Sequence, residues 1–204
     1  MSDARAEVLG SIRSALGGAP AVPEVPRDYH GPGAAEVDLG VFCERVADYR
    51  AEVHRVSESE LAGALAEACG RLGLRRVGTT LDHAVEGVEL VRDDPPLAVA
   101  DLDGLDGVLT GCALGIAETG TFVLDGAAAS GRRALTLVPD VHLCVIHERQ
   151  VVASVPDAVE RLAEAAADGR PVTFVSGPSA TSDIELDRVE GVHGPRTLEL
   201  FVVA

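Results

Sequence analysis

Ser57-Glu58-Ser59-Glu60-Leu61 opens the stretch that decides the fold class of this 204-residue chain. Ser57 followed three residues later by Glu60 is a capping-box pattern, which predicts the start of a helix. Apolar residues then recur at helical spacing as far as Leu72. Two short strand candidates come next, at 77–79 and 88–91. This alternation of helix and strand predicts an α/β fold with a mostly parallel sheet and crossover helices.

The part of the chain before this stretch contains an amphipathic helix pattern and a Gly/Pro-rich segment. The helix pattern covers 2–16, and the Gly/Pro-rich segment that follows it is typical of an extended arm. A helix and a short strand are then predicted at 37–49 and 51–56. We therefore expect two parts, an N-terminal helix with its arm at 1–33 and an α/β domain at 34–204.

The part after this stretch is rich in closely spaced apolar runs that predict strands, at 107–110, 121–124, 135–138, 143–146 and 151–152. Residues 97–105 suit either a short helix or a loop. Ser154 is the expected N-cap of a helix that continues to Asp168. Two final apolar runs predict buried strands, at 172–175 and 198–203.

A long polar stretch, Ser176 to Pro195, separates these two final strands. It consists largely of Gly, Pro, hydroxyl and carboxylate residues and includes one His, and it is long for a mere connection. A loop of this kind either carries function or is disordered. The density of hydrogen-bonding groups favours a functional loop.

Composition excludes several classes of function. A net charge of −16 argues against nucleic acid or an anionic membrane surface as the main partner. All 17 basic residues are Arg, so a Schiff-base lysine and a phosphate-loop lysine are both excluded. The four cysteines form no C-x-x-C pair, which argues against an iron–sulfur or structural zinc site in this chain. No segment has the length of a membrane span or a signal core, so we expect a cytoplasmic protein.

Three polar clusters are candidates for a common site. They lie at 116–121, at 138–142 and in the long polar stretch. Because ligands in open α/β folds bind at the carboxyl ends of strands, we expect the three loops to meet there. The candidate site residues are Glu118, Thr119, Gly120, Thr121, His142, Gly177, Ser179, Thr181, Asp183, Glu185, Glu190 and His193.

Most of these residues also have a plain structural interpretation. Thr119-Gly120-Thr121 suits a turn, His142 suits a satisfied buried histidine, and Asp183 with Glu185 suits a solvated strand edge. If the loops do form a site, two chemistries fit it. Carboxylates and imidazoles bind a divalent cation, and Glu118 suits a carboxylate nucleophile or base. The G-x-S-x-G and G-x-G-x-x-G motifs are both absent.

The clusters also carry a resemblance to a known family. Four motifs occur in order: Ala117-Glu118-Thr119-Gly120-Thr121, Leu137-Val138-Pro139-Asp140-Val141-His142, Gly177-Pro178-Ser179-Ala180-Thr181-Ser182-Asp183-Ile184-Glu185 and Gly191-Val192-His193-Gly194-Pro195. Together they resemble the lactate-utilisation protein C family, the LUD-domain proteins, over roughly the last hundred residues. The family pattern often has Arg where this chain has Ala180. An anion would then need another group here, and Arg132 and Arg188 are candidates.

The resemblance implies a fold and a pathway. The implied fold is a three-layer open α/β sheet, mixed or mostly parallel, similar to the ribose-5-phosphate isomerase and CoA-transferase group. The N-terminal helix and Pro-rich arm would be additions to it. The implied role is oxidation of L-lactate to pyruvate beside separate iron–sulfur subunits. Absence of a cysteine cluster here fits that division of labour.

Three functional hypotheses follow. The leading one is an accessory, ligand-binding subunit of a lactate-oxidation system. This subunit would have no cofactor of its own other than a divalent metal. The rival is a stand-alone CoA-transferase-like or isomerase-like enzyme that uses Glu118. The third is a structural scaffold whose polar loops pair with one another. The sequence leaves the ligand and the oligomeric state open.

Overall fold

The structure is a computed structural model that describes residues 2–17, 24–29, 31–33, 35–178 and 194–204. The chain divides into two units, Met1–His30 and Gly31–Ala204. The first contains one helix, α1 (Ser2–Leu16), as the amphipathic pattern predicts. Its apolar stripe of Val8, Ile12 and Leu16 is exposed. No helix in the described ranges combines the length and the apolar character needed to cross a membrane.

The second unit is built on a six-stranded main sheet in the order β1-β10-β7-β4-β2-β3. All five strand pairings in it are parallel. The strands are β1 (Glu52–Val56), β2 (Arg76–Thr79), β3 (Glu89–Arg92), β4 (Gly107–Gly111), β7 (Val141–His147) and β10 (Thr197–Val203). The predicted α/β class with a mostly parallel sheet flanked by helices is confirmed.

A second, four-stranded sheet in the order β8-β5-β6-β9 was not predicted. It pairs β5 with β6 and β6 with β9 in antiparallel fashion, and β5 with β8 in parallel. Its strands are β5 (Leu114–Ile116), β6 (Thr121–Leu124), β8 (Val151–Val152) and β9 (Thr173–Val175). The short helical turn η1 (Ala117–Thr119) joins β5 to β6.

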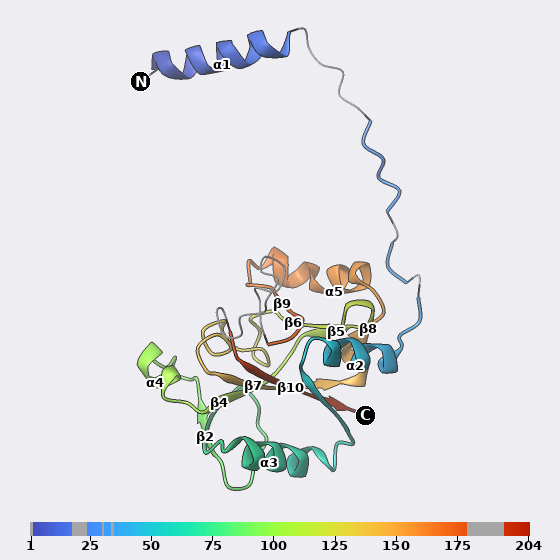
Figure 1. Cartoon of the computed structure of the whole chain (residues 1–204), viewed down its shortest axis with the longest axis vertical. Helices are drawn as coiled ribbons and strands as arrows, with labels where there is room; N and C mark the ends of the chain where they lie inside the picture. The colour runs from blue at the N-terminus through green and yellow to red at the C-terminus, as the bar shows by residue number, and fades with distance from the viewer. Residues whose placement is uncertain (1, 18–23, 30, 34, 179–193) are drawn as a thin grey trace. The chain divides into compact units, whose positions relative to one another are not determined.

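Helices and the second sheet cover the two faces of the main sheet (Figure 1). On one face, α3 packs Leu61 and Leu65 against β7 and β10. On the other face, α2 and the second sheet share a core with the same two strands. The outer face of the second sheet is covered by α5. The helices are α2 (Leu39–Asp48), α3 (Leu61–Leu72), α4 (Val99–Asp103) and α5 (Val155–Ala167), and the short turn η2 (Glu148–Gln150) precedes β8.

Side-chain alternation along β7 explains why both coverings are needed. Leu143 and Val145 belong to the core beneath α3, whereas Cys144 and Ile146 belong to the core beneath the second sheet. Successive strand side chains point to opposite faces, so a continuous apolar run such as 143–146 needs a cover on each side. His142 lies on the same face as Cys144 and Ile146, which is the face toward the second sheet.

Local signals were correct at most element boundaries. The Glu60 carboxylate accepts hydrogen bonds from the backbone N–H and hydroxyl of Ser57. Helix α3 nevertheless begins at Leu61 with Glu60 as its N-cap, so the prediction of Ser57 as the N-cap was wrong by three residues. Ser154 caps α5 as predicted.

Two strand expectations were wrong. Residues 135–138 form turns closed by backbone bonds to Arg132 and Ala134. Strand β9 lies at the edge of the second sheet, with Phe174 50% exposed, and is not buried.

Gly120, the residue that ends η1, lies close to the backbone of α2. Its φ is +59°, and a Cβ atom there would lie 2.5 Å from the backbone carbonyl carbon of Arg45. We expect Gly120→Ala to lower the free energy of unfolding by about 2–5 kcal/mol, because left-handed strain adds to overpacking. Urea unfolding measures the loss.

Gly70→Ala is the matched control, since a Cβ at this exposed position in α3 would meet nothing within 4 Å. It should raise the free energy of unfolding by roughly 0.5–1 kcal/mol. Equal effects of the two substitutions would show that the contact between η1 and α2 is not tight.

Candidate functional site

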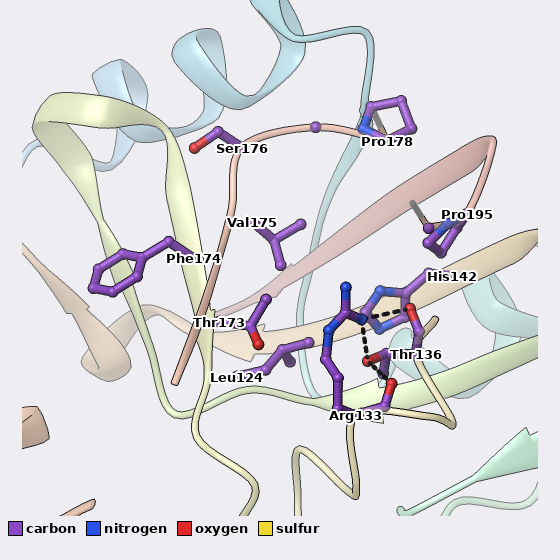
Figure 2. Close-up of a pocket in the computed structure, with 12 residues that line it drawn as sticks. Leu124, Arg133, Thr136, His142, Thr173, Phe174, Val175, Ser176, Pro178 and Pro195 are labelled. Carbon is purple, nitrogen blue, oxygen red and sulfur yellow. Dashed lines mark hydrogen bonds between the residues drawn. The ribbon is translucent and has the colours of Figure 1, made fainter. Parts of the chain in front are cut away.

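A cavity of about 120 Å³ lies between the two sheets, near the start of β7. It takes one wall from the main sheet, another from β6 and β9, and the rest from the segments that lead into β7 and β10 (Figure 2). The lining residues are Leu124, Arg133, Thr136, His142, Thr173, Phe174, Val175, Ser176, Gly177, Pro178, Gly194 and Pro195.

His142 forms the main-sheet wall of this cavity. Its ring is 2% exposed, and its Nε2 lies 2.8 Å from the Thr110 hydroxyl of the neighbouring strand. Phe122 of the second sheet approaches the imidazole edge-on, with the ring centroids 5.8 Å apart. Burial, reinforced by the positive charge of Arg133, lowers the pKa of His142 to about 3. The imidazole is therefore neutral at physiological pH.

Arg133 supplies the charge of the cavity. Its Nη1 donates to the Thr136 carbonyl and hydroxyl oxygens, both at 3.2 Å. Figure 2 shows the guanidinium beside the His142 ring. Burial lowers the pKa of Arg133, with no opposing contribution from a carboxylate. The side chain therefore brings a partly desolvated cation to the cavity wall.

Hydroxyl groups connect the β6 loop to the cavity. The Thr119 hydroxyl donates to that of Thr121 at 2.8 Å, and the Thr121 and Ser176 hydroxyls lie 2.6 Å apart. Ser176 and Gly177 both line the cavity. Gly177 has a φ of +103°, and a Cβ atom there would lie 2.7 Å from Tyr49. A larger residue at this position would therefore displace the start of the long polar stretch.

Glu118 lies in a different place from His142. It is exposed on η1, and its Oε1 accepts a hydrogen bond from the backbone N–H of Val155 at 2.6 Å. Val155 is the first residue of α5, so the carboxylate binds the positive end of that helix. The hollow beside Glu118 is a separate one, lined by Arg45, Asp48, Tyr49 and Thr119.

The described part of the chain thus brings together some of the predicted site residues. Thr119, Thr121 and Gly177 are linked to the cavity of His142 through Ser176, and Gly120 holds η1 against α2. The meeting place is not the one expected, because His142 is the second residue of β7 and lies near the amino end of the strand. The predicted residues that lie outside the described ranges are Ser179, Thr181, Asp183, Glu185, Glu190 and His193.

Arg132 and Arg188 were the candidates to replace the Arg of the family pattern, but the arginine that lines the cavity is Arg133. Arg132 is held by Asp93, whose carboxylate accepts from Nε and Nη2 at 2.6 and 2.9 Å. Arg188 and Ala180 lie outside the described residues. Arg133 was missed, because in the sequence it differs from Arg132 only by one position. The sequence predicted a strand at 135–138, and that prediction did not place the side chain of Arg132 or of Arg133 near His142.

The carboxylate and imidazole groups that do come together in the described ranges lie elsewhere. Glu52, His54 and Glu199 hold three candidate ligand atoms within 4.8 Å of one another, where β1 pairs with β10. Both oxygens of Glu199 already bind Arg71, at 2.9 and 2.8 Å, and Oε2 also binds His54 at 2.8 Å. These contacts fit a buried ion-pair network better than a metal centre.

The fold and the cavity define an α/β protein whose polar loops border a small site between two sheets. The LUD domain model matches residues 99–203. Lactate utilization protein C of Deinococcus radiodurans is 46% identical over 99% of this chain and 96% of that protein. Lactate utilization protein C of Shouchella clausii is 35% identical over a shorter span, 39% of this chain and 36% of that protein.

A solved structure agrees with these similarities. The crystal structure of a duf162 family protein from Deinococcus radiodurans has a TM-score of 0.71 and 44% sequence identity. The match covers 81% of this chain and 96% of that one. The chain belongs to the LUD domain family, which confirms the resemblance that the four motifs carried.

The lowered pKa of His142 predicts an acid-sensitive fold. Between pH 6.5 and 3 the unfolded chain binds a proton on this imidazole that the folded chain does not. Stability is therefore lost as pH falls through that window. We expect this group alone to lower the free energy of unfolding by about 2 kcal/mol from pH 7 to pH 5.

Urea unfolding of the wild type and of His142→Gln at both pH values measures the effect. The fall should be smaller in the variant by about that amount, since Gln does not titrate. His147, whose pKa is lowered mainly by burial, contributes with the same sign to both proteins and cancels in the comparison. Equal falls would show that His142 is not buried as a neutral group.

Proposed function

We propose that this protein is a component of a lactate-utilisation system, acting as an accessory, ligand-binding subunit in the oxidation of L-lactate to pyruvate. The observation that carries the proposal is the 46% identity, over nearly the whole chain, to a protein named lactate utilization protein C. Similarity along both chains makes a shared role more plausible than similarity over one motif would.

The cavity supports a ligand-binding role. It joins a neutral imidazole, an arginine and hydroxyl groups in one small, partly enclosed space. Such a combination of apolar walls with a few converging polar groups is typical of a small-molecule site. The hydroxyl that lies within hydrogen-bond distance of the His142 imidazole belongs to Thr110, which is fully buried and does not line the cavity. It is therefore not placed to attack a bound ligand, which favours binding over covalent chemistry.

The proposal assigns the electron-carrying centres to other proteins. Lactate oxidation releases two electrons, and the four cysteines of this chain are free thiols without a shared metal site in the described ranges. Separate iron–sulfur proteins would hold those centres, and this chain would carry no redox cofactor of its own. A cytoplasmic location is part of the proposal.

Reconstitution tests the subunit role directly. The chain is mixed and purified with candidate iron–sulfur proteins, and electron transfer from L-lactate to an artificial acceptor is followed with and without it. We expect a stable complex and at least a tenfold gain in rate, because a missing subunit removes a ligand site or a docking surface. No complex together with an unchanged rate would refute the role.

A stand-alone CoA-transferase-like enzyme that uses Glu118 is the second candidate. One observation favours it, since Glu118 is exposed beside an open hollow of about 550 Å³, large enough for a sizeable substrate. The hydrogen bond from the Val155 N–H weighs against it, because it holds the carboxylate in a helix-capping position.

Glu118→Gln separates the two candidates. The amide oxygen of Gln can still accept from Val155, so the fold should persist. A carboxylate nucleophile would be lost, and acyl transfer from a coenzyme A thioester should then fall by at least a thousandfold. Under the leading proposal, association with the iron–sulfur proteins stays unchanged, as in the control Glu164→Gln on the exposed face of α5.

A further inference from the structure

Arg133 differs from the other partly buried arginines of the second unit in having no carboxylate partner among the described residues. Arg132, Arg170 and Arg76 each contact an acidic side chain, at 2.6, 2.6 and 3.8 Å. Among the described residues, the guanidinium of Arg133 donates hydrogen bonds to Thr136 alone, through Nη1. Its Nε and Nη2 groups donate to no acceptor in the described part of the chain.

Within the described ranges, no carboxylate compensates the positive charge that Arg133 brings to the cavity. The protein as a whole carries −16, so anions are repelled at long range and need a local cation to bind. Partial burial weakens the hydration of the guanidinium and strengthens its attraction to an anion. A carboxylate or phosphate also matches the fork that Nε and Nη2 form.

Size and lining narrow the class of anion. A cavity of about 120 Å³ is well below the 300–1,000 Å³ typical of sites for larger ligands, so a nucleotide or coenzyme A does not fit. Leu124, Val175 and Pro195 supply apolar walls for a short carbon chain. Thr173 adds a hydroxyl that forms no hydrogen bond with the described residues. His142 is neutral and neither repels nor neutralises the anion.

We propose that this cavity binds a small monocarboxylate with an oxygen on its α-carbon, held by Nε and Nη2 of Arg133. Thr173 of β9 lines the same cavity (Figure 2), and its hydroxyl would hydrogen-bond to the α-oxygen. The inference rests on the proposed function, in that it names the ligand class of the same site. It assigns Arg133 a binding role and no chemical step.

Binding to the unmodified full-length protein provides the first test, by isothermal titration at pH 7.5. Three probes of similar size separate the contributions: L-lactate, propionate without the α-oxygen, and lactamide without the charge. L-lactate should bind with one-to-one stoichiometry. Propionate should bind about two- to tenfold more weakly and lactamide about tenfold to a hundredfold more weakly, from the ranges for neutral and charged hydrogen bonds. Equal binding of lactate and lactamide would overturn the inference.

Variants locate the site. Arg133→Gln should raise the dissociation constant for L-lactate about tenfold to a hundredfold, whereas Arg133→Lys should recover part of the affinity through its point charge. Arg161→Gln removes the same charge from an exposed position on α5 and should bind as the wild type does. Thr173→Val should weaken the binding of L-lactate and leave the binding of propionate unchanged. Unaltered lactate binding by Arg133→Gln, shown by circular dichroism to be folded, would overturn the assignment.

The outcomes distinguish this inference from the subunit role. Lactate binding through Arg133 without a complex with iron–sulfur proteins would support the site and refute the subunit role. The opposite result has two parts: the complex with Arg133→Gln is as active as the wild type, and the isolated chain does not bind lactate. This result would support the subunit role and refute the site. Inorganic phosphate serves as a competing probe, and displacement of lactate by equimolar phosphate would show a general anion site and overturn the monocarboxylate class.

Discussion

The burial of β7 and β10 on both faces is the constraint on which the rest of the structure depends. These two strands lie side by side inside the main sheet, and most side chains along them are buried and apolar. A parallel sheet of this kind is stable only when each face is covered. Helix α3 covers one face, and α2 with the second sheet covers the other. The candidate site exists because the second covering is itself a sheet, which leaves a small gap near the start of β7.

Much of this fold could be predicted from local patterns. Helical spacing and capping residues marked α3 and α5, and apolar runs marked β4, β7 and β10. The second sheet could not be predicted in the same way, because its strands are only two to four residues long and carry too little pattern to show their partners. Residues 135–138 misled for a related reason. Leu135 is fully buried, as a residue of an inner strand would be, but it lies in a hydrogen-bonded turn.

The site was predictable in part, and for a physical reason. Thr119, Thr121, His142 and Gly177 stood out because polar residues or glycine interrupt apolar runs. Of these, His142 and Gly177 line the cavity, and the hydroxyls of Thr119 and Thr121 reach it through Ser176. Arg133 carried no such signal. An arginine in a polar turn is ordinary, and only the tertiary structure distinguishes it from Arg132, which Asp93 neutralises. Glu118 was the candidate nucleophile or base, but its carboxylate is engaged at the start of α5.

The position of β10 has a consequence for how the protein is made. Within the described part of the chain, β1 joins the main sheet through β10 alone, and their contact pairs His54 with Glu199 across 145 positions of sequence. As the chain leaves the ribosome, α2 and β1 emerge long before this partner is synthesised. At ordinary elongation rates of about 5–20 residues per second, their apolar faces then remain exposed for many seconds. A chaperone that shields exposed strands during this interval would be expected to raise the yield of folded protein.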